Sequence, residues 1–228
     1  MIAIIGAMEE EVEMIKKNIS ELKESKYQSL VFYNGMIKNK EVVLMKSGIG
    51  KVHATFATTV LFEHFNIELV INIGTAGGVK PDAEILDLVL GNKVCYHDVD
   101  VTAFNYQYGQ VPECPLYFES NKKLLTLAEK VLKEEEINYH KGLIASGDAF
   151  IHNEKQIEAI KSYFPDVLAV EMEACAIGHI CHIYEKPFII MRALSDIAGK
   201  KSELSFDNYL IASANNSAKF VLKLLNQI

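Results

Sequence analysis

Two glutamates, Glu171 and Glu173, flank a methionine inside the otherwise apolar stretch AVEMEACAIGHICH. A carboxylate that leaves water needs a compensating partner, because its desolvation costs on the order of several kcal/mol. The only arginine of the chain, Arg192, lies in a second apolar stretch, PFIIMRALSD. A buried guanidinium needs a carboxylate in turn, so the sequence predicts an ion pair of Arg192 with Glu11 or with the Glu171/Glu173 pair. A purely structural ion pair is the alternative to a functional one.

Apolar runs typical of buried strands alternate along the chain with segments of helical periodicity. We expect strands at residues 2–6, 29–37, 41–47, 68–74, 87–101, 141–148, 167–172 and 187–196, and helices at residues 9–19, 50–66, 121–136, from 154, at 173–184 and from 206 onward. This alternation predicts an α/β fold with a mostly parallel sheet covered on both faces. No linker or repeat interrupts it, so residues 1–228 are expected to form a single domain.

Ligands of such sheets bind beyond the carboxyl ends of the strands. The unusual residues of this sequence gather at the predicted strand ends, in the segments 8–11, 47–50, 74–78, 146–150, 171–173 and 195–196. Their convergence predicts one binding site at that edge of the sheet.

Two glycine-rich motifs have weaker specificity. SGIGKVHA lacks the third glycine of a dinucleotide fingerprint, since His53 stands there, and it lacks the Ser or Thr of a phosphate loop, since Val52 follows the lysine. A tight turn that brings the backbone close to a ligand is favoured. IGTAGG is read as a glycine-rich turn whose one side-chain donor is Thr75, with a plain turn as the alternative.

Two groups of side chains have the residue types of metal ligands. In YHDVDV a strand would place His97 on one face and both aspartates on the other. Cys175, His179 and His182 share a helix face, but among apolar neighbours a packed helix is favoured over a zinc site. We therefore expect no metal and no cofactor.

Composition excludes several classes of protein. Of the 228 residues, 50% are apolar and 23% are charged, which is ordinary for a globular protein. The net charge of −7 argues against nonspecific binding to nucleic acid or anionic membranes. No apolar run reaches the roughly 18 residues of a membrane span, no basic leader precedes Glu9, and the four cysteines lack disulfide-like spacing. A cytoplasmic enzyme or binding protein is expected.

Seven segments, in order along the chain, resemble the 5′-methylthioadenosine/S-adenosylhomocysteine nucleosidases: IIGAMEEEV, SGIGKV, GTAGG, YHDVDVTAF, GLIASGDAFI, VEMEA and RALSD. The resemblance extends from Ile4 to about Phe206. It implies a three-layer αβα sandwich with a mixed central sheet, as in the purine nucleoside phosphorylase and nucleosidase superfamily. It also implies a homodimer that needs no metal. The implied reaction is hydrolysis of the bond between adenine and a 5′-thio-substituted ribose, which serves methionine salvage; 5′-deoxyadenosine is a further expected substrate.

The resemblance assigns the chemistry to matched residues. Asp196 would be the general acid that protonates adenine, with Ser195 as its orienting group, and this requires a carboxyl pKa raised by desolvation. Glu11 would be the base for the attacking water, which Thr75 and Arg192 help to place.

The remaining matched residues would bind the substrate. Glu173 would accept hydrogen bonds from the two ribose hydroxyls, and its place at a helix N-terminus is expected to keep it ionised. Met172 would pack on the sugar, Phe150 would stack on adenine, and the Ile151 backbone would bind the purine edge. The wall around the 5′-thio group matches Met8, Ile49 and Phe206. For Glu171 only a supporting ion pair or indirect contact is expected.

The segment VDVTAFNYQYGQVPECP is apolar and irregular, which is typical of an interface. By resemblance it crosses a two-fold axis, so that Val101, Phe104 and Pro112 close the 5′-thio pocket of the neighbouring chain. A loop folded back on its own core is the alternative.

Three other functions were weighed against hydrolysis. A purine nucleoside phosphorylase would need several cationic donors for phosphate, whereas this chain has one arginine and Glu11 would repel the anion. A noncatalytic nucleoside-binding protein would need neither an acid nor a base. A 6-amino-6-deoxyfutalosine hydrolase of menaquinone synthesis stays open as an alternative.

Overall fold

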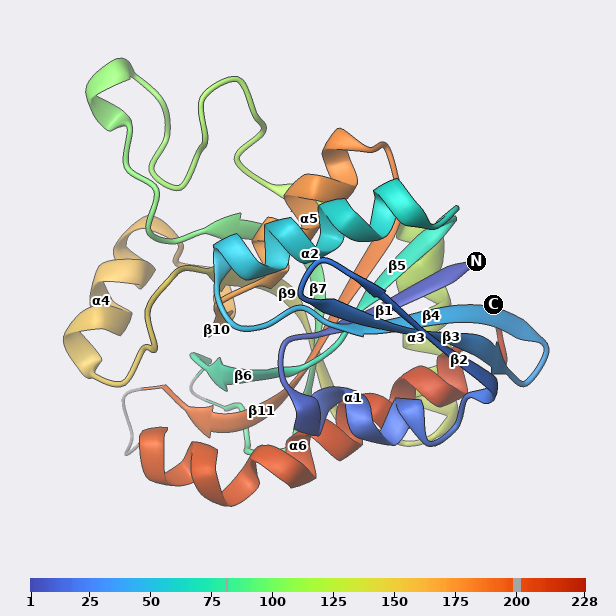
Figure 1. Ribbon diagram of the computed structural model, residues 1–228. Coiled ribbons are helices and arrows are strands. Elements are labelled where there is room, and N and C mark those ends of the chain that lie inside the picture. Colours follow the sequence, from blue (N-terminus) through green and yellow to red (C-terminus); the bar gives the residue numbers. More distant parts are fainter. Residues whose placement is uncertain (81, 199–201) are drawn as a thin grey trace.

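The apolar runs of the sequence form most of the strands of one mixed sheet in the computed structural model, which describes residues 1–80, 82–198 and 202–228 (Figure 1). The strands are β1 (Ile2–Gly6), β2 (Ser20–Tyr27), β3 (Leu30–Ile37), β4 (Lys40–Lys46), β5 (Leu69–Asn72), β6 (Thr75–Gly78), β7 (Leu88–Tyr96), β8 (Phe118–Glu119), β9 (Tyr139–Ser146), β10 (Val167–Glu171) and β11 (Phe188–Ile197). Their order across the sheet is β2-β3-β4-β1-β5-β11-β6-β10-β9-β7-β8, and β7 pairs with β11 as well.

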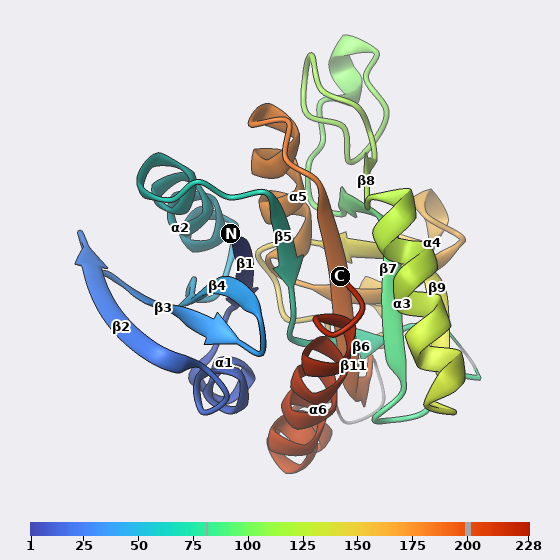
Figure 2. The ribbon, with the colours of Figure 1, turned by 90° about the vertical axis from the view of Figure 1, so that its right-hand side faces the viewer.

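Helices cover both faces of this sheet, as Figure 2 shows. They are α1 (Glu9–Lys16), α2 (Lys51–His64), α3 (Lys122–Glu134), α4 (Glu154–Tyr163), α5 (Ala174–Ile183) and α6 (Ser202–Leu224). Helices α2 and α5 bury their apolar side chains in one core with residues of β1, β4, β5 and β11. Helices α1, α3 and α6 bury theirs in a second core on the opposite face. The three-layer αβα sandwich with a mixed sheet is therefore confirmed.

The expectation of a mostly parallel sheet, drawn from the alternation of elements, holds by a narrow margin, because six of the eleven strand pairings in the described part of the chain are parallel and five are antiparallel. β1 is parallel to β4 and β5, and β11 is parallel to β5 and β6. In contrast, β3 is antiparallel to β4, β10 to β6, and β7 to β11. Antiparallel neighbours need no helical crossover, so the two residues between β3 and β4 suffice to join that pair.

Three strands have no apolar run that would mark them in the sequence. β2 has the sequence SELKESKY and is mostly exposed at the edge of the sheet, where charged side chains discourage pairing with another chain. β8 has only two residues. β6, with the sequence TAGG, was expected to be a turn and is instead a buried strand between β10 and β11.

Residues 97–117 leave the sheet after β7 and project from the molecule as a long loop with one 3₁₀ turn, η1 (Thr102–Phe104) (Figures 1 and 2). The base of this projecting segment is fixed, because the Tyr108 ring stacks on Tyr163 at 3.8 Å and its hydroxyl donates to the His97 carbonyl. Its tip is not folded onto the core: the Phe104 side chain is 75% exposed. The alternative of a loop folded back on its own core therefore fails for the tip.

None of the helices in the described part of the chain combines the length and the apolar character that crossing a bilayer requires.

Candidate active site

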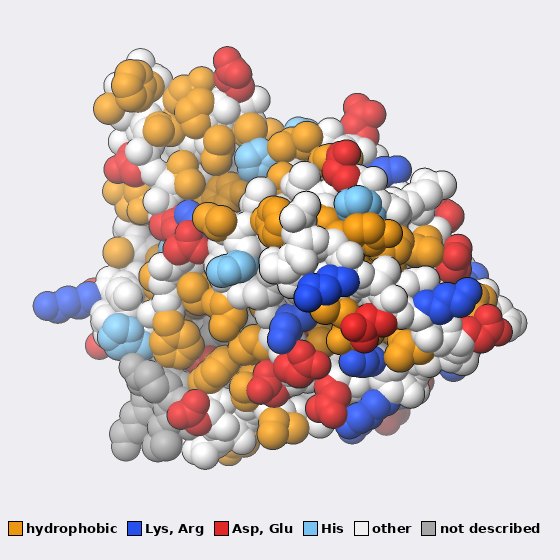
Figure 3. Space-filling view, in the orientation of Figure 1, with side chains coloured by type: hydrophobic (Ala, Val, Ile, Leu, Met, Phe, Trp, Pro, Cys, Tyr) orange, Lys and Arg blue, Asp and Glu red, His pale blue; other side chains and the backbone are white. Residues whose placement is uncertain are grey.

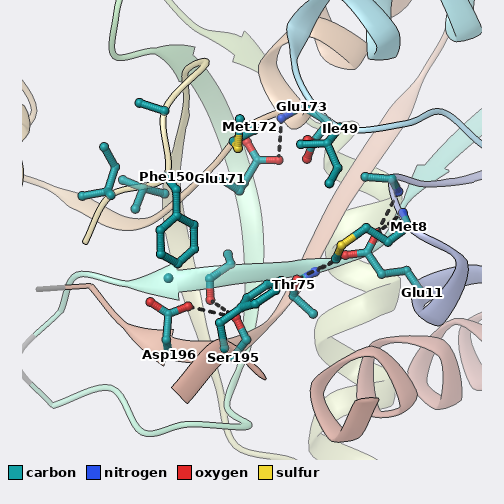
Figure 4. A pocket seen from close by; sticks show the side chains of 17 residues that line it. Met8, Glu11, Ile49, Thr75, Phe150, Glu171, Met172, Glu173, Ser195 and Asp196 are labelled. Carbon is teal, nitrogen blue, oxygen red and sulfur yellow. Dashed lines mark hydrogen bonds between the residues drawn. The ribbon is translucent and has the colours of Figure 1, made fainter. Parts of the chain in front are cut away.

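A cavity of about 220 Å³ lies at the carboxyl ends of the strands (Figure 4). Residues from seven separate segments of the chain line it: Ala7, Met8, Glu11, Ile49, Thr75, Ala76, Gly77, Ala149, Phe150, Ile151, Val170, Glu171, Met172, Glu173, Ser195, Asp196 and Phe206. All the residues that the sequence assigned to a site within one chain are in this set, with one exception. The exception is Arg192, which lies behind the lining.

Glu11 is the third residue of α1, and its carboxylate turns back toward the start of that helix. One oxygen accepts from the backbone N–H groups of Ala7 (2.7 Å) and Met8 (3.1 Å). The other accepts from the backbone N–H (2.8 Å) and the hydroxyl (3.2 Å) of Thr75. Burial raises the pKa of Glu11, against the lowering effects of the Arg192 charge and of the backbone donors. A buried carboxylate is thus fixed by four donors at one end of the cavity.

Two glycines of the GTAGG motif provide room for carboxylates. A Cβ on Gly74 would lie 2.7 Å from a Glu11 oxygen, and the φ of this residue, +151°, also disfavours a side chain. A Cβ on Gly77 would lie 3.1 Å from an Asp196 oxygen. The glycines of this motif therefore let two acidic side chains approach the backbone. The sequence prediction of a turn did not indicate this role.

Asp196 lies at the opposite side of the cavity floor and is 1% exposed. Strand β11 has one extra residue, Ser195, where it pairs with β6, and such bulges re-aim side chains next to functional sites. The Ser195 hydroxyl donates to an Asp196 oxygen at 2.9 Å. In Figure 4 the Phe150 ring points down toward these two residues, so Asp196 has an aromatic neighbour on its cavity side.

Glu173 occupies the N-cap position of α5, but its side chain does not cap that helix. Its carboxylate accepts from the backbone N–H of Gly50 at 2.8 Å, at the start of α2. Burial raises the pKa of Glu173, and the charge of Glu171 raises it further, while Arg192 and the Gly50 N–H lower it. The expectation that the helix N-terminus keeps this group ionised is wrong, because burial and a like charge outweigh the helix dipole.

The ion pair predicted for Arg192 is confirmed, and its partner is Glu171. Nη2 of Arg192 donates to a Glu171 oxygen at 2.6 Å and to the Asn72 side-chain oxygen at 2.8 Å. Nη1 donates to the Met191 carbonyl, while Nε has no hydrogen-bond partner among the described residues. The guanidinium is 1% exposed. It therefore acts on the cavity mainly through its charge and through Glu171.

The histidine-containing groups of the sequence are engaged elsewhere. His179 contacts the Tyr96 hydroxyl at 3.1 Å and the Cys114 sulfur at 3.4 Å. Asp98 forms an ion pair with Lys51 at 2.7 Å. Within the part of the chain that the structure describes, no group of three or more His, Cys, Asp or Glu side chains is arranged to hold a metal ion.

The residues predicted to serve a neighbouring chain stand apart from this cavity. Val101, Phe104 and Pro112 belong to the projecting segment and are not part of the lining.

Comparison with known proteins defines the class to which this fold and cavity belong. The model of the family described as the phosphorylase superfamily matches residues 1–226. A curated relative, the 5′-methylthioadenosine/S-adenosylhomocysteine nucleosidase of Bacillus cytotoxicus, is 47% identical over 228 residues, which covers 100% of this chain and 99% of the relative.

Solved structures agree with the sequence comparison. A nucleosidase of the same name from Neisseria meningitidis, in complex with methylthio-immucillin-A, has a TM-score of 0.98 and 42% identity, and covers 100% of this chain and 99% of its own. One from Colwellia psychrerythraea, in complex with adenine, has a TM-score of 0.95 and 39% identity, and covers 99% of this chain and 94% of its own. The chain thus belongs to the phosphorylase superfamily and, within it, to the 5′-methylthioadenosine/S-adenosylhomocysteine nucleosidases.

The raised pKa of Glu173 has a consequence for stability. The folded protein retains this proton at pH values where the unfolded chain, with a glutamate pKa of 4.5, has released it. Stability is therefore lost as the pH rises above that value. We expect Glu173→Gln to abolish this loss, so its free energy of unfolding should exceed that of wild type by a margin that grows, to a few kcal/mol at most, between about pH 5 and about pH 8.

Denaturant titrations at the two pH values measure this margin. Glu10→Gln, at an exposed position of α1, is the matched control for the loss of one carboxylate. A margin for Glu173→Gln that shrinks as the pH rises would contradict the raised pKa.

Proposed function

We propose that this protein hydrolyses the N-glycosidic bond of 5′-methylthioadenosine and S-adenosylhomocysteine, and also of 5′-deoxyadenosine. The products are adenine and the 5′-substituted ribose. The observation that carries the proposal is the pair of buried carboxylates, Glu11 and Asp196, held at separate places in the lining of one ligand-sized cavity. The full-length similarity to nucleosidases supports the same reaction.

Asp196 is the proposed general acid. Adenine leaves as an anion unless a nitrogen is protonated, so a carboxyl group must hold a proton at neutral pH. The near-complete burial of Asp196 favours the protonated form. The Ser195 hydroxyl donates to one carboxyl oxygen, and Asp196 is part of the cavity lining. The nearby Phe150 ring would stack on the purine, and the backbone of Ile151 would bind its edge.

Glu11 is the proposed base for the attacking water. Its four donors prevent rotation, so the carboxylate meets the water in one fixed orientation. Thr75 would share its hydroxyl with that water. Arg192 would help through its charge and through its Nε–H, which has no hydrogen-bond partner among the described residues. As positive charge develops on the ribose, the carboxylates around it stabilise the transition state.

Glu173 is the proposed acceptor for the two ribose hydroxyls, and Met172 the surface on which the sugar packs. The Gly50 N–H fixes one Glu173 oxygen and thereby the whole carboxylate. Met8, Ile49 and Phe206 would form the apolar wall for the 5′ substituent. Ile49 is 51% exposed, so this end of the cavity opens to solvent and can accept a short methylthio or a longer homocysteinyl group.

Water is favoured over phosphate as the nucleophile, because none of the described lining residues is Lys or Arg. A phosphate would meet the carboxylates of Glu11 and Glu173 without a cationic donor. A noncatalytic binder would not need an acid and a base held in this way. A 6-amino-6-deoxyfutalosine hydrolase uses the same bond cleavage and is the remaining alternative, to be compared as a substrate.

The proposal extends to assembly and location. We propose a single domain over residues 1–228, a cytoplasmic location and a homodimer in which the projecting segment covers the 5′ end of the neighbouring cavity. Exposed apolar side chains gather on this side of the molecule, over the projecting segment and α2 (Figure 3). They include Phe104, Val52 and Phe56. Surfaces of this kind mark interfaces, and two-fold dimers are the commonest assembly.

The nucleophile is tested by the products. With 5′-methylthioadenosine we expect free adenine and free methylthioribose at the same rate with and without phosphate, measured by chromatography of the reaction mixture. A rate that requires phosphate, with a sugar 1-phosphate among the products, would assign the protein to the phosphorylases.

The acid and the base are tested by removing each charge while keeping the shape. Asp196→Asn and Glu11→Gln should each lower kcat by about 10²–10⁴-fold, because each group acts mainly in the transition state. Steady-state kinetics measures the loss, and adenine binding by calorimetry shows that the cavity is intact. Either variant retaining the wild-type kcat would show that its role is misassigned.

The shared pocket is tested on the projecting segment. Phe104→Asp should raise the KM for 5′-methylthioadenosine by about tenfold and weaken dimerisation, because it places a charge in the proposed interface. Sedimentation and steady-state kinetics measure the two effects. Leu22→Asp, at an exposed apolar position of the edge strand β2, is the control. A monomeric Phe104→Asp variant with an unchanged KM would mean that each site is complete within one chain.

A further inference from the structure

We propose that Glu171 is a positioning residue. It caps helix α5, a task that would otherwise fall to Glu173, and so leaves the Glu173 carboxylate directed at the ribose. This inference rests on the proposed function, in which Glu173 binds the ribose hydroxyls. Glu171 lines the cavity, yet its carboxylate is committed to the protein, so its effect on the substrate must pass through another side chain.

The first N–H groups of α5 are bound by Glu171 and not by the residue at the N-cap position, Glu173. A polar side chain at the N-cap position normally binds the free N–H groups of the first turn. Glu173 occupies that position and does not do so. Instead, one Glu171 oxygen accepts from the N–H groups of Glu173 (3.0 Å) and Ala174 (2.8 Å). The Ser146 hydroxyl accepts from the next N–H, that of Cys175, at 2.8 Å.

This arrangement leaves the Glu173 carboxylate available for other contacts. It turns away from its own helix and accepts from the Gly50 N–H, on a segment 123 residues away. If the N–H groups of α5 lost their acceptor, they would become unpaired donors inside the protein. Glu173 is the nearest carboxylate and stands at the N-cap position, so we expect it to rotate onto them and leave the ribose.

Glu171 itself is held too firmly to rotate. One oxygen accepts from the Ser146 hydroxyl, and the other accepts from Arg192 as well as from the two N–H groups. Arg192 is in turn bound to Asn72, whose amide donates to the Ile5 carbonyl at 2.9 Å. The chain of contacts therefore ties the start of α5 to β9, β11, β5 and β1, and buried networks of this kind have one stable arrangement.

The test is the preference of the enzyme for a complete ribose. It is the ratio of kcat/KM for 5′-methylthioadenosine to kcat/KM for its 3′-deoxy analogue. Glu171→Ala should lower this preference about tenfold or more, because the carboxylate that reads the hydroxyls is misplaced. Glu171→Gln retains an acceptor for the two N–H groups and should restore part of the preference. Ser146→Ala, which removes one support of the cap, should lower it to a smaller extent.

Three controls separate positioning from general damage. The affinity for adenine, which has no ribose, should stay at the wild-type value in every variant. Glu129→Gln removes another ion-paired glutamate, from α3, where it contacts Lys141, and should leave the preference unchanged. In a Glu173→Gln background, adding Glu171→Gln should not change the preference further, since the two side chains act as one unit.

The outcomes also distinguish this inference from the proposed function. A wild-type protein that releases no adenine from 5′-methylthioadenosine refutes the function. If the wild-type protein cleaves both nucleosides at equal kcat/KM, the positioning role is refuted, because the enzyme then does not recognise the ribose hydroxyl that Glu173 is proposed to bind. An unchanged preference in Glu171→Ala or, if that variant does not fold, in Ser146→Ala also overturns the inference. So does an equal loss for both nucleosides that is accompanied by a loss of adenine affinity.

Discussion

A single buried guanidinium, that of Arg192, faces three buried glutamate side chains, and the site depends on how its one positive charge is distributed among them. Arg192 is bound directly to Glu171 at 2.6 Å and acts on Glu11 and Glu173 only through space. Arg192 therefore compensates the charge of Glu171 by direct contact, whereas burial raises the pKa of the other two carboxyl groups. A cavity lined by carboxyl groups, with no cationic residue among the described lining residues, offers an anion no compensating charge. It favours a neutral ligand that becomes positive during reaction, as a ribose does when its glycosidic bond breaks.

The backbone of the sheet decides where these charges can lie. Gly74, directly before β6, and Gly77, within it, let Glu11 and Asp196 approach the main chain more closely than a Cβ would permit. The bulge at Ser195 breaks the register of β11 against β6 at the point where Asp196 enters the cavity. Both features weaken a strand considered alone. They are stable here because β6 is buried between β10 and β11, whose pairing holds its four residues in place.

The sequence was informative where burial is regular. Continuous apolar runs located most of the strands, and the rule that ligands bind at strand ends brought together residues that do line one cavity. The solitary arginine in an apolar strand correctly implied a buried carboxylate partner. Periodicity failed for β2, which is polar because it lies at an exposed edge, and for β6, whose glycines resemble a turn. It could not choose Glu171 over Glu11 as the partner of Arg192, because that choice depends on strand order.

The ionisation of Glu173 was misjudged for a related reason. A helix N-terminus was expected to stabilise its charge, but the N–H groups that carry the positive end of the dipole are bound to Glu171 and Ser146. Glu173 thus experiences burial and the like charge of its neighbour, which raise its pKa, and only the Gly50 N–H and the through-space charge of Arg192 oppose them. The same three contacts that deprive Glu173 of the helix dipole leave it free to face the cavity. Its unfavourable ionisation and its availability to a ribose diol therefore have a single structural cause.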